Sequence, residues 1–114
     1  TSGLPEYFGW VNANDPVRFA AATNADVLAG LAKARPKQRP GERHAYTNTN
    51  YVLLAELVRA ADGRPLARFL ADEVFGPLGM ADSRVCDAVP FAVPNRAAGY
   101  AGGKPARLDG PIHG

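Results

Sequence analysis

The sequence predicts a mostly α-helical unit of about three helices joined by long loops. Apolar residues recur at intervals of three and four in three separate stretches, which is the spacing of a buried helical face. The 12 glycines and 10 prolines gather largely between those stretches, where they favour turns and irregular backbone. With 114 residues and 46% hydrophobic content, the chain can form one small domain, and we treat residues 1–114 as a single unit.

The first segment, residues 1–16, predicts an irregular loop. It is rich in glycine and proline and lacks a regular apolar repeat. Its aromatic residues Tyr7, Phe8 and Trp10 are expected to anchor the loop by packing, with the lining of a substrate cleft as the alternative.

The first helix is expected to begin at Thr23. Asp26 follows three residues later, which is a capping arrangement, and Pro36 is expected to end the helix. Its apolar stripe consists of Val27, Leu28, Leu31 and Ala32. The polar residues 33–43 then form a turn.

The second helix is expected to follow Asn48 and to end at Gly63, a residue suited to a helix C-terminus. Glu56 and Arg59 are predicted on its exposed side. Its buried face is predicted to consist of Tyr51, Leu54, Ala55, Val58 and Ala61.

The third helix is expected to start at Pro65, in the first turn, and to end at Gly76. Its stripe is Leu66, Phe69, Leu70, Val74 and Phe75, and we expect it to pack against the second helix as a hairpin. Residues 84–114 predict an extended loop or a short strand, for example at residues 89–93.

Charge and cysteine content exclude several kinds of partner. A net charge of +2, without a long basic run, gives little attraction for nucleic acid or an acidic membrane surface. No apolar run approaches the ~18 residues of a membrane span. The single cysteine, Cys86, excludes an intrachain disulfide and is predicted to be a semi-buried apolar residue. We expect neither a metal nor a cofactor. The composition is compatible with a bacterial source. Both an exported and a cytoplasmic location stay open.

Three linked stretches carry a family resemblance. Residues 40–51 read PGERHAYTNTNY, residues 74–83 read VFGPLGMADS, and residues 1–5 read TSGLP. Together they resemble the serine β-lactamase-like hydrolases, which include class C β-lactamases, DD-peptidases and related esterases. The resemblance implies that this chain is the helical lobe of a β-lactamase/transpeptidase-like α/β fold, with the sheet domain largely absent.

The resemblance also implies roles for Tyr46 and Asn48. A serine hydroxyl needs a base to become a nucleophile, and a phenol can act as that base when a nearby lysine lowers its pKa from the usual value of about 10. Tyr46 would be the catalytic group that handles this proton. Asn48 would bind substrate, accepting from the lysine and donating to the acyl side chain, with Thr47 as a spacer.

The rest of such a site is missing from the sequence. Ser2 and Ser83 are followed three residues on by Pro5 and Cys86, so neither forms a Ser-x-x-Lys motif. A Lys-Thr-Gly motif is absent too. We therefore expect an internal segment of a longer protein, inactive alone, whose partners are the missing sheet domain and a small-molecule or peptide substrate. Apolar surface left uncovered is expected to promote self-association.

Several alternatives stay open at this stage. Tyr46 could be a structural tyrosine at a helix end, and Asn48, Thr49 or Asn50 could be the helix N-cap. His44 is expected to be a solvated loop histidine. The chain could also belong to a non-catalytic penicillin-recognising relative, or it could be a free-standing interaction module. The substrate could be a β-lactam, a D-alanyl peptide or an ester.

Overall fold

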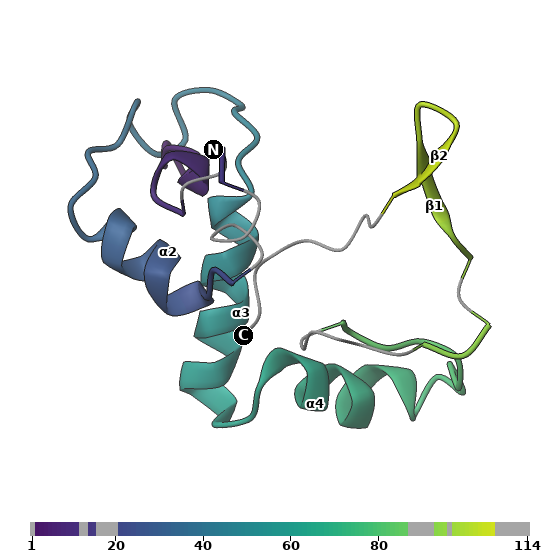
Figure 1. Ribbon diagram of the computed structural model, residues 1–114. Helices are drawn as coiled ribbons and strands as arrows, with labels where there is room; N and C mark the ends of the chain where they lie inside the picture. The colour runs from purple at the N-terminus through teal and green to yellow at the C-terminus, as the bar shows by residue number, and fades with distance from the viewer. Residues whose placement is uncertain (1, 12–13, 16–20, 87–92, 96, 107–114) are drawn as a thin grey trace.

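The computed structural model describes residues 2–11, 14–15, 21–86, 93–95 and 97–106. The elements are η1 (Tyr7–Gly9), α2 (Asn24–Leu31), α3 (Thr49–Asp62), α4 (Leu66–Leu70), η2 (Ala71–Phe75), β1 (Gly99–Ala101) and β2 (Lys104–Ala106). In Figure 1, α2 and the N-terminal segment lie against α3, and α4 leads away from its end. Helix thus predominates over strand, as the sequence predicts.

A single helical turn interrupts the N-terminal loop. The prediction of no regular element is wrong at η1, a 3-10 turn in which the Trp10 backbone N–H donates to the Tyr7 carbonyl at 2.7 Å. Glu6 caps this turn, because its Oε1 accepts from the Tyr7 backbone N–H at 3.1 Å. The turn matters because it places Glu6 and Tyr7 beside the start of α3.

Helix α2 begins at the predicted cap. Thr23 Oγ1 accepts from the Asp26 backbone N–H at 3.3 Å, and Asp26 Oδ2 accepts from the Thr23 backbone N–H at 2.9 Å, which completes a capping box. The Thr23 backbone N–H, followed by the Thr23 hydroxyl at 2.8 Å, donates to the Asp26 carboxylate and holds the pKa of Asp26 below its usual value. The helix ends at Leu31, before the predicted stop at Pro36.

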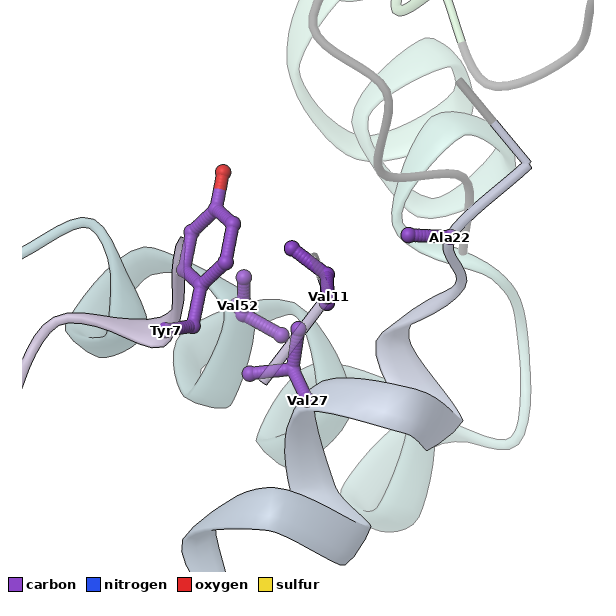
Figure 2. Packing of buried hydrophobic residues seen from close by; sticks show 5 residues of the cluster. All are labelled: Tyr7, Val11, Ala22, Val27 and Val52. Carbon is purple, nitrogen blue, oxygen red and sulfur yellow. The ribbon is translucent and has the colours of Figure 1, made fainter. Parts of the chain in front are cut away.

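The hydrophobic core lies between the N-terminal segment, α2 and α3. It consists of Tyr7, Val11, Ala22, Val27 and Val52. Figure 2 shows the side chains of Val27 from α2 and Val52 from α3 pointing toward one another. Trp10 packs on this cluster and lies so close to α2 that a Cβ at Gly30 would be 2.5 Å from its ring. Only glycine fits at that position without a shift of the indole.

Helix α3 has the predicted extent but turns a different face inward. It ends at Gly63, whose φ of 86° is the left-handed conformation that glycine adopts easily. The predicted buried stripe is wrong at Tyr51 and Leu54, which are 59% and 55% exposed, and at Ala61, which is also exposed. Val52 is buried instead, because α2 and the N-terminal segment pack on the neighbouring face of α3.

The predicted third helix is present as α4 and η2, but the predicted hairpin is wrong. Pro65 precedes α4, and the last turn widens to a π-helix in which the Gly76 backbone N–H donates to the Ala71 carbonyl at 2.9 Å. Figure 1 shows α4 turning away from α3 instead of returning along it. Arg64 lies at this corner and forms ion pairs with Asp72 and Glu73, at 3.1 and 2.8 Å.

A small hairpin forms the described part of the C-terminal region. Strands β1 and β2 are antiparallel, with Tyr100 opposite Pro105. The chain reverses through Gly102 and Gly103, both at positive φ. Most of the strand suggested at residues 89–93 lies outside the described residues. No helix within the described part of the chain is both long and apolar enough to cross a membrane.

Candidate functional site

An open pocket of about 310 Å³ lies where α3 meets α4. Its apolar lining includes Val52 and Ala55 from α3 and Leu66 and Ala67 from α4. Its lining also includes the two candidate residues Tyr46 and Asn48, together with Tyr7, Tyr51 and Cys86. The structure therefore brings both sequence-predicted site residues to one cavity.

Tyr46 presents an accessible phenol to this pocket. The residue is 64% exposed, so it is not buried as a structural tyrosine would be. Its hydroxyl donates to Asn48 Oδ1 at 3.1 Å. Its ring lies beside the Tyr51 ring, with centroids 5.7 Å apart. The hydroxyl hydrogen is thus engaged with Asn48, and the phenol oxygen keeps lone pairs for another donor.

Asn48 is held by Glu6 and does not cap α3 with its side chain. Its backbone has helical angles, and its carboxamide makes no capping bond. Glu6 Oε2 accepts from the Asn48 backbone N–H and from Nδ2, each at 3.0 Å. Because the Asn48 amide group carries two hydrogens, one can still be offered to a ligand.

The other candidate caps are occupied elsewhere. Thr49 Oγ1 donates to the Pro5 carbonyl at 2.8 Å, and Asn50 Oδ1 accepts from Ser2 Oγ at 2.6 Å. Thr47 Oγ1 accepts from the Thr49 backbone N–H at 3.3 Å, so Thr47 satisfies part of the helix start. Asn48 is therefore the N-cap by position, without a capping bond from its side chain, whereas the alternatives of Thr49 and Asn50 as caps are wrong because both lie within α3. Thr47 is only 4% exposed, so it is also no mere spacer.

Residues 2–6, here called the N-terminal clamp, bind residues 47–50 along their length. Ser2, Pro5 and Glu6 supply the partners just described. Sequence reasoning missed Glu6, which lies 42 positions from Asn48. No local spacing signals a contact over that distance, and only the tertiary structure shows that Glu6 belongs to the site.

The second phenol in the pocket differs from Tyr46. Tyr7 is 7% exposed, and burial, followed by the charge of Glu6 and the proximity of Tyr46, raises its pKa. A raised pKa keeps this hydroxyl protonated at neutral pH. Tyr7 and Trp10 pack in or on the core, as expected for aromatic anchors, and Tyr7 also lines the cavity.

Two further residues were assigned environments from the sequence. His44 is exposed, which confirms the expected solvated loop histidine. Cys86 is exposed at the pocket, so the prediction of a semi-buried residue is wrong.

Among the described residues, no group of three or more His, Cys, Asp or Glu could hold a metal ion.

Comparisons with known proteins point to one family. The family model described as Beta-lactamase matches residues 1–113. Penicillin-binding protein 4* of Bacillus subtilis (strain 168) is 37% identical over 105 residues, covering 88% of this chain and 23% of the relative. The D-alanyl-D-alanine-carboxypeptidase/endopeptidase AmpH of Escherichia coli (strain K12) is 34% identical over 83 residues, or 73% of this chain and 21% of the relative.

A D-aminopeptidase of Brucella ovis is 36% identical over 64 residues, which cover 55% of this chain and 12% of that protein. The chain thus spans less than a quarter of the length of each of these curated relatives. No solved structure gave a significant match.

Proposed function

The chain belongs to the serine β-lactamase-like family, and from this premise we propose that it supplies Tyr46 and Asn48 to a hydrolase that works through a serine acyl-enzyme. The observation that carries the proposal is the hydrogen bond between the Tyr46 hydroxyl and the Asn48 carboxamide at the pocket. This bond puts a proton-handling group and a substrate-binding group within one hydrogen bond of each other.

The proposed mechanism assigns a separate task to each side chain. Tyr46 acts as the phenolate that the lysine of the longer polypeptide stabilises. It takes the proton from the serine nucleophile as the serine attacks a carbonyl, and then passes that proton to the leaving group. Asn48 donates its amide hydrogen to the acyl side chain of the substrate. The accessible Tyr46 suits the first task better than Tyr7, whose raised pKa opposes loss of its proton.

The proposal places the remaining catalytic groups outside this chain. The printed sequence has no Ser-x-x-Lys motif, and it spans 23% of the length of penicillin-binding protein 4*. We infer that the nucleophile, its lysine and the sheet domain lie in the rest of a longer polypeptide, and that this chain alone is inactive. The exposed side chains of Tyr51, Leu54 and Leu57 on α3 would then pair with that polypeptide and promote self-association without it.

The substrate class follows from the relatives only in part. Two of them are named for the cleavage of D-amino acid compounds, and a third for penicillin binding. We propose a carbonyl substrate of this kind, which keeps β-lactams, D-alanyl peptides and activated esters as candidates. The apolar lining of the pocket suits an acyl group with an apolar side chain.

The decisive test is Tyr46→Phe in the full-length protein. Loss of the hydroxyl removes the proton shuttle, so turnover should fall by about 100-fold or more, with an unchanged melting temperature. Tyr51→Phe is the matched control, because it removes a hydroxyl from the neighbouring exposed ring.

Intact mass spectrometry after brief exposure to a penicillin and to an activated ester should show an acyl adduct on the wild type. Wild-type turnover by Tyr46→Phe would refute the role of Tyr46. Absence of an adduct and of turnover with both compounds would instead favour a non-catalytic penicillin-recognising relative.

A further inference from the structure

We propose that Glu6 is a positioning residue that fixes the orientation of the Asn48 carboxamide and, with it, the amide hydrogen that is offered to substrate. The effect on catalysis rests on the proposed function, but the contact itself does not. Glu6 Oε2 accepts from both the backbone N–H and the side-chain Nδ2 of Asn48 at 3.0 Å. One carboxylate oxygen therefore holds Asn48 by its main chain and its side chain together.

The chemistry of the carboxylate decides which end of the amide faces which neighbour. An ionised carboxylate only accepts hydrogen bonds, so the Asn48 amide nitrogen must turn toward Glu6. The amide oxygen must then turn toward Tyr46, whose hydroxyl donates to it at 3.1 Å. Without Glu6, nothing in this pair of contacts would prevent the amide from flipping, since its two ends are similar in size.

This orientation has a consequence for the pocket. A flipped amide would present its nitrogen to Tyr46, and the phenol oxygen would have to accept that hydrogen. The amide hydrogens would then lie on the side of Tyr46, away from their present position. Glu6 thus keeps the second Asn48 amide hydrogen in place for a substrate carbonyl.

Both carboxylate oxygens of Glu6 accept hydrogen bonds, so a substitution that removes one acceptor tests the proposal. Oε1 accepts from the Tyr7 backbone N–H, while Oε2 accepts from Asn48. A glutamine at this position has one accepting oxygen and one donating nitrogen, so it cannot satisfy both sets of donors. Glu6→Gln therefore removes the negative charge and one of the two acceptors, which weakens the hold on Asn48 while keeping the size of the side chain.

The test compares two activated esters in the full-length protein, one with an amide in its acyl side chain and one with a plain acetyl group. Glu6→Gln should lower kcat/KM about tenfold for the amide-bearing ester, because it misplaces the amide that binds that ester. The acetyl ester should change by less than about threefold. In an Asn48→Ala background, Glu6→Gln should cause no further loss on the amide-bearing ester.

Glu73→Gln is the matched control, because Glu73 is 52% exposed and bonds to Arg64 far from the site. It should leave both esters unaffected. Equal losses on the two esters, unchanged kinetics for Glu6→Gln, or additive losses in the double variant would each overturn the positioning role.

A second measurement decides the contact without catalysis. In ¹⁵N-asparagine-labelled protein, the Asn48 side-chain amide signals should move in Glu6→Gln and stay in place in Glu73→Gln. Asn48 amide signals that do not move in Glu6→Gln would overturn the inference. If the wild type were acylated by neither ester, the proposed function would fail, and the amide signals would still decide whether Glu6 holds Asn48.

Discussion

The two ends of α3 are held in different ways. At its start, buried side chains and hydrogen bonds join residues between 32 and 48 positions apart, as between Asn24 and Glu56 or Ser2 and Asn50. At its end, α4 and η2 contain no buried residue, and Arg64 bonds to carboxylates only 2 to 9 positions away. The first region is fixed by tertiary structure and the second mainly by local charges.

This difference has a direct bearing on the pocket, which is shared by the two regions. The polar groups of Tyr46 and Asn48 belong to the first region, and the apolar wall of Leu66 and Ala67 belongs to the second. Catalytic geometry needs fixed polar groups, whereas an apolar wall can adjust to its ligand. We therefore expect substitutions in the first region to have the larger effect on stability and on the site.

Val27→Ala should produce the largest loss. Val27 is 0% exposed in the core, and removing two methyl groups should lower the free energy of unfolding by about 2–3 kcal/mol. In this chain without the longer polypeptide, Leu57→Ala removes more atoms from a residue that is 62% exposed, and should cost less than about 0.5 kcal/mol. Urea denaturation of both variants measures the contrast. Equal losses would mean that Leu57 is covered and that the two faces of α3 are alike.

Thr49→Val tests the N-terminal clamp with a side chain of the same shape. The hydroxyl donates to the partly buried Pro5 carbonyl at 2.8 Å, so its loss should cost about 1–2 kcal/mol by leaving that carbonyl with only the longer bond from Thr47, at 3.4 Å. Thr49→Ser keeps the donor. The carbonyl ¹³C shift of Pro5 should therefore move in the valine variant and stay close to wild type in the serine variant. A Pro5 signal unmoved in Thr49→Val would show that this bond does not hold the clamp.

Local patterns predicted the features that depend on near neighbours. The Thr23–Asp26 capping box and the end of α3 at Gly63 follow from residues close in sequence, and both are confirmed. The Tyr-x-Asn spacing led to Tyr46 and Asn48, and the structure places both at the pocket. The reason is physical, because caps and turns are satisfied within a few residues.

Features decided at long range were missed. The stripe through Tyr51 and Leu54 is as apolar as the buried face, so periodicity could not tell which face α2 covers. The hairpin prediction was wrong because the apolar spacing within each helix does not encode the direction in which the chain leaves Gly63. Glu6 was missed for the same reason, since its partner is 42 positions away.

Glu56 offers a smaller, pH-dependent test at the interface of α2 and α3. Its side chain is 13% exposed and accepts from Arg59 and from Asn24 Nδ2. The bond from Arg59, followed by that from Asn24, lowers the pKa of Glu56 below the ordinary value. A lowered folded-state pKa stabilises the fold above the unfolded-state pKa, and this stability is lost as the pH falls through the folded-state pKa.

Glu56→Gln should therefore cost about 1 kcal/mol at pH 7, and the difference from wild type should shrink as the pH falls below about 4. Thermal melting at pH 7 and at pH 3 measures it. The control Glu73→Gln lies on the more exposed η2 and should change little at either pH. A difference that persists undiminished in acid would indicate a packing effect rather than the ionised carboxylate.

Arg64→Gln should have the smallest effect, although Arg64 makes more ion pairs than any other residue in the described part of the chain. Its carboxylate partners Asp62, Asp72 and Glu73 are 26%, 32% and 52% exposed, so water screens each pair. The melting temperature should fall by less than about 3 °C, and less still in 1 M salt. Arg68→Gln, which loses one pair to Asp72, is the control. A salt-independent loss as large as that of Val27→Ala would mean that the corner is fixed as firmly as the core. The apolar wall of the pocket would then be as rigid as its polar groups, and the contrast between the two ends of α3 would not hold.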